Sequence, residues 1–517
     1  MTPPNIGEGQ LLALSRSLAS SRDPLAVYSA LTDSGTRPDT LLIETDECAL
    51  IMERAALRVT CRGQQVELVA LSDGGLLLLP PIARQLAEYV VESDGRLLKL
   101  CFPRTTSQDA KERLVAPSPF DALRALLFSY ESLSPEEPFA LVIAGILAFD
   151  HVDLFEDLPQ AREDPIGFPD FRFWLPESLI LFGPEGTARI ICAAFGSNET
   201  REAERSFHMA AERLTLLIQR CSSPVQVAPD GSEARAPVPY EERRRATPDL
   251  DDATFAQLVG TLKTHIASGD IYQIVPSRSF SLTCEEPLQS FARQRSIDPS
   301  PYMFYVASSD EIVFGASPES AVTLTSGKSR TLAVKPMAGT RARGTTLDED
   351  DRLEADLKLD DKEVAEHMML VDLARNDVAR VSVPGTRRVT KLLDVERYAR
   401  VMHLTSRVEG ELLPELDAFH ALQACLNVGT LSGAPKLKAT QLLRQYEAAK
   451  RGPYGGAVGW ICSSGAMNTG VIIRSALVKD GLAQVRVGAG IVQESDPLTE
   501  AKETSAKASA LLAALQD

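Results

Sequence analysis

Residues 361–377, "DKEVAEHMMLVDLARND", combine a recurring apolar pattern with closely spaced acidic side chains. The segment predicts a helix, because no residue in it breaks one and apolar side chains recur along it: Val364, Met368, Leu370, Val371 and Leu373. Glu363 and Glu366 are three residues apart and therefore project from one side of that helix. From these residues alone, two interpretations stay open: a solvated helix face, or a pair of ligands for a cation.

The end of the chain repeats this pattern. Residues 495–515 predict a helix, with Ser495 or Asp496 as N-cap and Pro497 in the first turn. Glu500 and Glu503 are again three residues apart. Two helices that each offer two carboxylates can meet around a divalent ion, and an all-oxygen site completed by water suits Mg²⁺.

Composition limits the class of protein. The chain has 517 residues, of which 44% are hydrophobic and 24% charged, as in ordinary globular proteins. Its 54 basic and 71 acidic residues give a net charge of −17, which argues against binding to nucleic acid or to an anionic membrane. The eight cysteines include no C-x-x-C pair, and the N-terminus has no signal-peptide pattern. We therefore expect a cytoplasmic protein.

Runs of predicted strands alternate with helices, which favours an α+β fold with mainly antiparallel sheets packed together and flanked by helices. Residues 222–250 are rich in Pro, Ser and charge and have no period, so they predict a linker. The expected organisation is an N-terminal region at 1–221, this linker, and a catalytic domain at 251–517.

Three glycine-rich loops follow predicted strands: "GTR" at 339–341, "GTLSGAPK" at 429–436 and "GAG" at 488–490. Such loops allow backbone N–H groups to approach an anion, although each is also compatible with a simple tight turn. Arg474 lies in the apolar strand "TGVIIRSALV", where a charge is unfavourable without a partner. A structural ion pair and a ligand carboxylate both remain open as that partner.

Ordered motifs along the chain resemble those of the chorismate-utilising enzymes, and within them the anthranilate synthase component I branch. The resemblance covers residues 250–517 and, more weakly, the N-terminal part. The motifs that carry it are "GDIYQIVPSR", "SPYMFY", "GASPES", "PMAGTR", "KEVAEHMMLVDLARNDVARV", "VMHLTSRV", "GTLSGAPK", "YGGAVGW", "VIIRSA", "GAGIVQES" and "EAKE".

The resemblance implies a set of ligands for chorismate and for magnesium. Glu366 and Glu503 would bind Mg²⁺ directly, with Glu363 and Glu500 supporting it through water. The ion would orient the ring carboxylate of chorismate. The enolpyruvyl carboxylate would be held by Arg474, Tyr454, Gly488, Ala489 and Gly490. The ring would be lined by Gly339, Thr340 and Thr430.

The resemblance also implies an amination at C2, with loss of the C4 hydroxyl, followed by elimination of pyruvate to give anthranilate. Hydroxide is a poor leaving group, so a general acid is required, and Glu319 is the candidate. His403 is the candidate for proton transfer in the second step. Gln273 stands where water-using relatives have a basic lysine, and Ala338 stands where another branch has a nucleophilic lysine. Both positions favour ammonia as the nucleophile.

No glutaminase module is recognised in this sequence, so ammonia would come from solution or from a separate glutamine amidotransferase subunit, component II, in a hetero-oligomer. The alternatives are an enzyme that releases 2-amino-2-deoxyisochorismate, a paralogue serving secondary metabolism, and a non-catalytic regulator that binds tryptophan or chorismate. Thr430 and His403 argue against release of the intermediate.

Family members in tryptophan biosynthesis bind tryptophan as a feedback inhibitor, through an "LLES" motif and "NPSPYMF". The corresponding stretches here are "LLIETDE" at 41–47 and "DPSPYMFY" at 298–305. The implied inhibitor site contains Thr45, Pro301, Tyr302 and Met303. Because Thr45 replaces a serine and Asp298 an asparagine, we expect inhibition by tryptophan to be weakened or absent.

Overall fold

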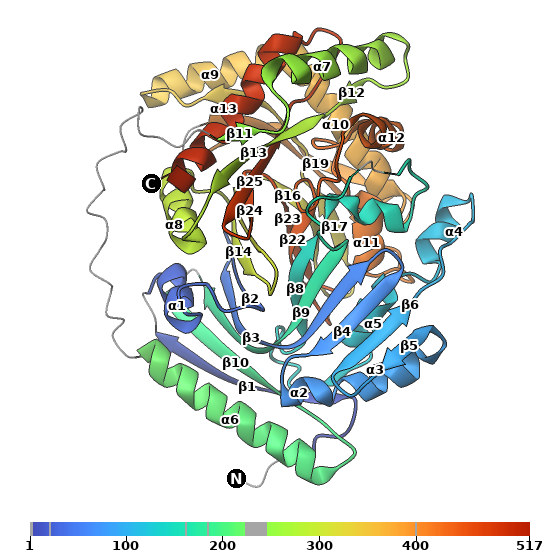
Figure 1. The fold of residues 1–517 in the computed structure, drawn as a ribbon, viewed down its shortest axis with the longest axis vertical. Coiled ribbons are helices and arrows are strands. Elements are labelled where there is room, and N and C mark those ends of the chain that lie inside the picture. The colour runs from blue at the N-terminus through green and yellow to red at the C-terminus, as the bar shows by residue number, and fades with distance from the viewer. Residues whose placement is uncertain are drawn as a thin grey trace.

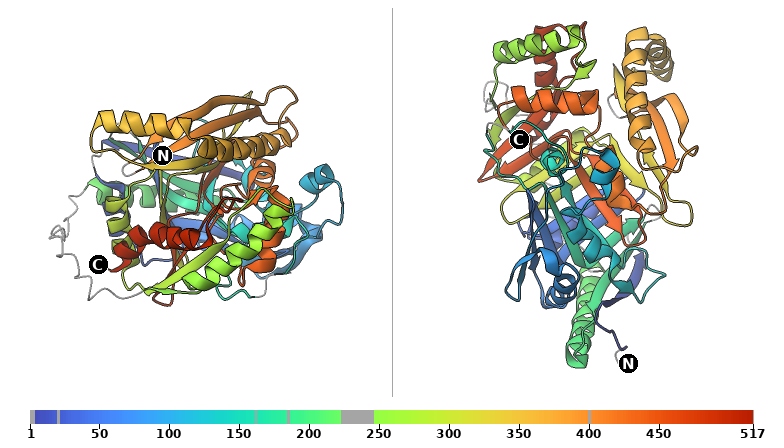
Figure 2. Two further views of the ribbon diagram at one scale, coloured as in Figure 1. Left: turned by 90° about the horizontal axis from the view of Figure 1, so that it is seen from above. Right: turned by 90° about the vertical axis from the view of Figure 1, so that its right-hand side faces the viewer.

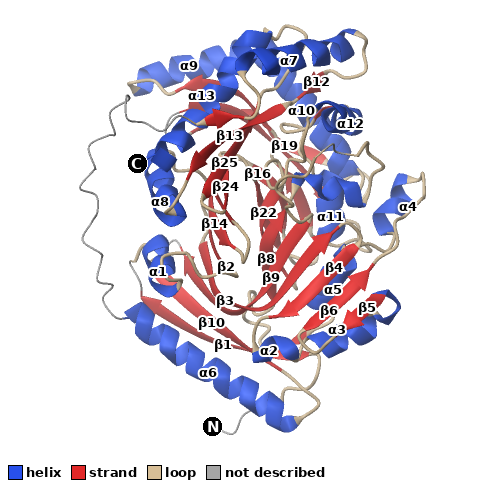
Figure 3. Cartoon of the chain, viewed as in Figure 1, coloured by secondary structure: helices blue, strands red, loops and turns tan. Residues whose placement is uncertain are grey.

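The computed structural model describes residues 4–19, 22–160, 163–183, 186–222, 246–398 and 401–516. Helices and mainly antiparallel strands are mixed along the chain (Figure 3), which confirms the α+β prediction. In the described part, hydrogen bonds join 23 strands into one branched network, and β12 (Gln273–Ile274) pairs separately with β21 (Gly433–Ala434). No helix in these ranges is long and apolar enough to cross a membrane.

The network branches at β9 (Phe171–Gly183), which changes partner near Pro176. Residues 171–174 pair with β8 (Val142–Leu147), whereas residues 178–183 pair with β10 (Thr187–Phe195). Proline has no N–H to donate, and β3 (Ala49–Arg62) shifts register opposite the same point. The strand can therefore take part in two arms of the sheet.

The two arms rise from this branch (Figure 1). One arm runs through β3, β2 (Thr40–Glu44), β14 (Tyr302–Ala307), β15 (Ile312–Ser317), β24 (Ser475–Lys479), β25 (Leu482–Gly488) and β13 (Ser277–Thr283). The other runs through β8, β22 (Ala457–Cys462), β23 (Met467–Val471), β16 (Ser320–Leu324), β17 (Thr331–Val334) and β20 (Val401–Glu411). β18 (Met337–Ala342) and β19 (Arg388–Arg397) pair with β20.

Pairing crosses the predicted boundary between residues 221 and 251. β2 pairs with β14, and β8 pairs with β22, so the N-terminal region and the C-terminal region share one sheet network. Within the predicted linker, residues 223–245 lie outside the described ranges. Its last residues include β11 (Thr247–Pro248), which pairs with β13. The division into two domains stays a prediction.

Helices cover the upper ends of the arms. α7 (Asp252–Ala267), α8 (Pro287–Ile297) and α13 (Pro497–Gln516) lie over the arm that ends in β13, and α12 (Lys436–Tyr446) lies beside β21. α9 (Leu347–Leu359) and α10 (Asp361–Ala379) pack on β18 and β20 and form with them a separate-looking lobe in Figure 2. The predicted helices at 361–377 and 495–515 are confirmed as α10 and α13.

Among the remaining elements, α6 packs on β10, and α11 packs on α10 and β16. These remaining elements are α1 (Pro24–Leu31), α2 (Asp73–Leu76), α3 (Leu79–Gln85), α4 (Ala110–Val115), α5 (Phe120–Phe128), α6 (Thr200–Ser222), α11 (Ala418–Cys425), β1 (Gln10–Ala19), β4 (Gln65–Ala70), β5 (Val90–Ser93), β6 (Leu97–Cys101) and β7 (Glu131–Ser132).

A buried carboxylate connects the elements at the top of the first arm. Glu447, which follows α12, accepts hydrogen bonds from the N–H and Oγ of Ser277 in β13, both at 2.8 Å. Arg451 donates to the same carboxylate at 2.7 and 2.8 Å, and Arg486 of β25 does so at 3.1 Å. Burial opposes ionisation, but the two guanidinium groups keep the pKa of Glu447 below its ordinary value. We call Glu447, Ser277, Arg451 and Arg486 the Glu447 network.

Replacing Glu447 by glutamine should destabilise the fold strongly, because it leaves two buried arginines without their anion. Removing one partner of a buried ion pair costs about 3–5 kcal/mol. Urea denaturation followed by tryptophan fluorescence measures the change. Glu415→Gln removes the same charge from an exposed position and is the matched control. A loss for Glu447→Gln within error of the control would contradict the role of the network.

Candidate active site

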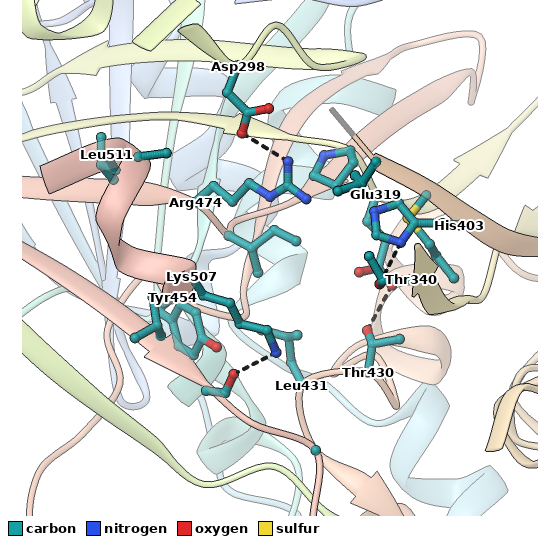
Figure 4. Close-up of a pocket in the computed structure, with 18 of the residues that line it drawn as sticks. Asp298, Glu319, Thr340, His403, Thr430, Leu431, Tyr454, Arg474, Lys507 and Leu511 are labelled. Atoms are coloured by element: carbon teal, nitrogen blue, oxygen red, sulfur yellow. Dashed lines mark hydrogen bonds and ion pairs between the residues drawn. The ribbon is translucent and has the colours of Figure 1, made fainter. Parts of the chain in front are cut away.

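A cavity of about 410 Å³ lies between the two arms, and its wall includes residues of α13 and of the α9–α10 lobe's strands (Figure 4). Its walls bring together eight of the residues predicted to bind substrate or act in catalysis: Glu319, Thr340, His403, Thr430, Tyr454, Arg474, Gly488 and Gly490. These positions span more than 170 residues of sequence, so the fold, and not local spacing, assembles the cavity.

A buried carboxyl group marks one end of the cavity. Glu319 lies in the turn between β15 and β16, and the hydroxyl of Thr430 donates to its Oε1 at 2.8 Å. Burial raises the pKa of Glu319 to about 7, and the Thr430 hydrogen bond limits that rise. At neutral pH a large fraction of this carboxyl group therefore carries a proton that it can donate.

A neutral histidine faces the same end of the cavity. His403 of β20 has its Nδ1 3.0 Å from Thr340 Oγ1 and 3.2 Å from the carbonyl of Gly339. Burial, and then the positive charge of Arg474, lower the pKa of His403 to about 4. Because a carbonyl only accepts, Nδ1 carries the proton in this arrangement. Nε2 has no hydrogen-bond partner among the residues that the structure describes, so its lone pair is available as a base.

The opposite end of the cavity is basic. Arg474 pairs with Asp298, with Nη1 3.0 Å from Oδ2, so an ion pair within the protein does exist. Lys507 of α13 lies near Arg474 in Figure 4 and contacts Glu503 at 2.7 Å and the carbonyl of Gly488 at 3.2 Å. The sequence prediction missed Lys507 and Asp298 as cavity residues. For Lys507 a signal existed, because it is four residues after Glu503 and on the same side of the helix.

Three predicted residues lie just behind the cavity wall. Gln273 is buried against Gly490, and a Cβ added to Gly490 would lie 3.0 Å from Nε2 of Gln273. Oε1 of Gln273 has no hydrogen-bond partner in the described part of the chain. Gly339 has φ +75°, and its missing Cβ leaves room for Glu363 Oε2. Ala489 is buried in the core and its N–H donates to the carbonyl of Pro276, so this N–H is already used within the protein.

The four predicted metal carboxylates lie on α10 and α13, and each has a partner within the protein. Glu363 pairs with Arg341, Glu366 with Lys362, and Glu503 with Lys507. Glu500 interacts with Ser495. In the part of the chain that the structure describes, no three His, Cys, Asp or Glu side chains converge closely enough to hold a metal.

The carboxylates nevertheless interact across the two helices. Burial raises the pKa of Glu366, and among the further causes the charges of Glu363 and Glu500 raise it as well. Burial likewise raises the pKa of Glu500, with a contribution from Glu503. A cation between α10 and α13 would relieve this repulsion, and carboxylate oxygens are ligands that suit Mg²⁺. The donor set therefore fits the ion chemically.

The predicted inhibitor residues gather where β2 ends and β14 begins. Met303 pairs with Glu44, which is the residue directly before Thr45. Pro301 and Tyr302 precede Met303 in the chain. The hydroxyl of Thr45 donates to the carbonyl of Cys48 at 3.0 Å, within the turn between β2 and β3. Tyr302 donates to Asn468 at 2.7 Å. These residues are neighbours, and tryptophan binding by them stays a prediction.

The protonation of Glu319 can be measured without substrate. The carboxyl C=O infrared band that is lost in Glu319→Gln should disappear with a midpoint near pH 7 as the pH rises. In Thr430→Val that midpoint should move upward, because the hydrogen bond that favours the carboxylate is gone. A midpoint near 4.5 in the wild type, the ordinary value for glutamate, would contradict the effect of burial.

Comparison with known proteins agrees with this geometry. Residues 92–513 match the family described as chorismate binding enzyme. Anthranilate synthase component 1 of Vibrio parahaemolyticus is 40% identical, covering 98% of this chain and 93% of its own. The pyocyanine-specific anthranilate synthase component 1 of Pseudomonas aeruginosa is 43% identical, over 89% and 86%. The crystal structure of anthranilate synthase component I from Streptococcus pneumoniae has a TM-score of 0.66 at 30% identity, covering 92% of each chain. The chain therefore belongs to the family of chorismate binding enzymes.

Proposed function

We propose that this protein converts chorismate and ammonia to anthranilate and pyruvate, as a lyase and the chorismate-binding subunit of an anthranilate synthase. The observation that carries the proposal is the pairing, in one cavity, of a protonated Glu319 with a neutral His403, opposite the basic groups of Arg474 and Lys507. The names of the related proteins support the same reaction.

The first step requires a proton donor for a poor leaving group. Nitrogen forms a bond to C2, the ring double bonds shift, and the C4–O bond breaks. Glu319 gives its proton to the departing hydroxide, which leaves as water, and the new ammonium group at C2 then loses one proton. A positioned general acid of this kind contributes about 10²–10⁴ in rate.

The second step requires a base. Nε2 of His403 takes the proton from C2, the C3–O bond of the side chain breaks, and the enol gains a proton to become pyruvate. The ring is then aromatic. The hydrogen bonds of Nδ1 to Gly339 and Thr340 hold the imidazole in the orientation and tautomer that this role needs.

Nitrogen is favoured over water as the nucleophile because Gln273 has no basic group. Its amide cannot deprotonate water, and its buried Oε1, which has no hydrogen-bond partner among the described residues, can only accept. Ammonia would reach the cavity from free ammonium or from a separate glutamine amidotransferase subunit.

Mg²⁺ would be held by Glu366 and Glu503, with Glu363 and Glu500 beside them, and when bound would neutralise and orient the ring carboxylate. The carboxylates on α10 and α13 support this assignment by their number and mutual repulsion. At the other end, Arg474, Lys507 and Tyr454 would bind the enolpyruvyl carboxylate.

Product analysis tests the function. With chorismate, Mg²⁺ and ¹⁵N-ammonium, the protein should form ¹⁵N-anthranilate and equimolar pyruvate. The rate of the first step should fall as pH rises through about 7, because Glu319 loses its proton. Glu319→Gln should lose about 10²-fold or more in rate, and His403→Ala should accumulate 2-amino-2-deoxyisochorismate. Isochorismate or salicylate as the main product would overturn the proposal.

Calorimetry tests the magnesium site independently of turnover. Glu503→Gln and Glu366→Gln each remove one carboxylate charge with little change in shape, so Mg²⁺ should bind at least tenfold more weakly to either variant. Glu349→Gln, on exposed α9 surface, is the control. Mg²⁺ affinity equal to that of the wild type in both variants would exclude these residues as ligands.

We also infer that tryptophan inhibits weakly, through Thr45 and residues 301–303. The extra methyl of threonine overpacks a filled pocket by about 1–3 kcal/mol, and about 1.4 kcal/mol is a tenfold change in affinity. In inhibition titrations, Thr45→Ser should therefore bind tryptophan about tenfold more tightly. Low-micromolar inhibition of the wild type, unchanged in Thr45→Ser, would show that the methyl is accommodated.

A further inference from the structure

The backbone at Arg474 is held in an unusual conformation. Arg474 lies between β23 and β24 with φ +47°, in the left-handed region that residues other than glycine seldom adopt. Its carbonyl accepts hydrogen bonds from Gln294 Nε2 at 2.6 Å and from the N–H of Ala316 at 3.2 Å. The surrounding structure therefore fixes the backbone of Arg474.

A second contact, at the end of the same helix, fixes the guanidinium group of Arg474. Asp298, which follows the last residue of α8, accepts from Nη1 of Arg474 at 3.0 Å, and Figure 4 shows the two side chains meeting at the edge of the cavity. Gln294 and Asp298 are four residues apart, so α8 holds both the backbone and the guanidinium of Arg474.

Helix α8 is itself anchored on another side. Arg295 pairs with Glu44 of β2 at 2.8 Å and with Asp23 at 2.7 Å. Asp298 and Arg474 therefore meet on a supported helix end, and both side chains are largely shielded from solvent, with exposures of 16% and 30%.

We propose that Asp298 is a positioning residue for Arg474 and that its negative charge also limits the affinity for the anionic substrate. The proposal rests on the proposed function, in which Arg474 binds the enolpyruvyl carboxylate. Asp298 occupies Nη1 and leaves the remaining N–H donors of the guanidinium fork for the ligand.

The two effects of Asp298 act in opposite directions. Holding the guanidinium in place removes the need to order it when substrate binds, which favours binding. A fixed carboxylate close to the incoming carboxylate repels it, which opposes binding. Arg474 offsets part of this charge, and of the other groups that face Asp298, His403 is neutral and Lys507 is shared with Glu503.

Two substitutions separate these effects. Asp298→Asn keeps an oxygen that can accept from Arg474 but removes the charge, so chorismate should bind at least threefold more tightly. Asp298→Ala removes both, so its dissociation constant should be at least tenfold higher than that of Asp298→Asn. The affinities are measured by calorimetry with chorismate and Mg²⁺ in the absence of ammonium. Glu286→Gln, before the first residue of α8, is the charge-matched control and should bind as the wild type does.

Steady-state kinetics gives the second readout. Both Asp298 variants should change KM and leave kcat within twofold, because Asp298 does not touch the reacting atoms. If Asp298→Asn binds chorismate no more tightly than the wild type, the charge effect is overturned. If Asp298→Ala binds chorismate as tightly as Asp298→Asn, the positioning role is overturned. If the wild type binds no chorismate at all, the proposed function has failed, and not this inference alone.

Discussion

The carboxylate of Glu447 lies beneath the cavity, and the walls of the basic end depend on it. Arg451, which Glu447 binds, also donates to the carbonyls of Leu431 and Val275 at 2.6 Å, and both of those residues line the cavity. The same guanidinium stacks on Phe149 at 4.4 Å and lies 6.0 Å from the ring of Tyr454. One buried anion thus sets the relative position of β13, β25 and the loop that carries Tyr454.

Burial has opposite effects on the two groups that exchange protons in the cavity. It raises the pKa of Glu319 to about 7 and lowers that of His403 to about 4, because in each case the charged form is disfavoured. At neutral pH the acid retains protons and the base is unprotonated, which is the pairing that loss of hydroxide and then of the C2 proton requires. The hydrogen bond from Thr430 lowers the pKa of Glu319, and the hydrogen bond to the carbonyl of Gly339 raises the pKa of His403, so each opposes the effect of burial.

Local patterns predicted the parts of the site that depend on local geometry. The i, i+3 carboxylates of α10 and α13 and the cap at Asp496 follow from spacing and backbone chemistry, and the structure confirms both helices. The motifs that resembled a family predicted eight of the residues that line the cavity.

Contacts between distant segments could not be predicted in this way. No local pattern in the sequence marks Glu447, and only the packing of β13 against β25 shows that its carboxylate is buried between them. Asp298 was considered only with the inhibitor site, yet it pairs with Arg474, which is 176 residues away. Ala489 was expected to offer a free N–H, but strand pairing places Pro276 opposite it. Partner choice across a sheet depends on register, which short motifs do not encode.

The Glu447 network supports the walls of the cavity as well as the fold. The most direct measurement is the chorismate affinity of Glu447→Gln, by calorimetry with Mg²⁺ at a temperature where circular dichroism shows the variant to be folded. We expect a dissociation constant at least tenfold higher than that of the wild type and of Glu415→Gln. An unchanged affinity in the folded variant would contradict it.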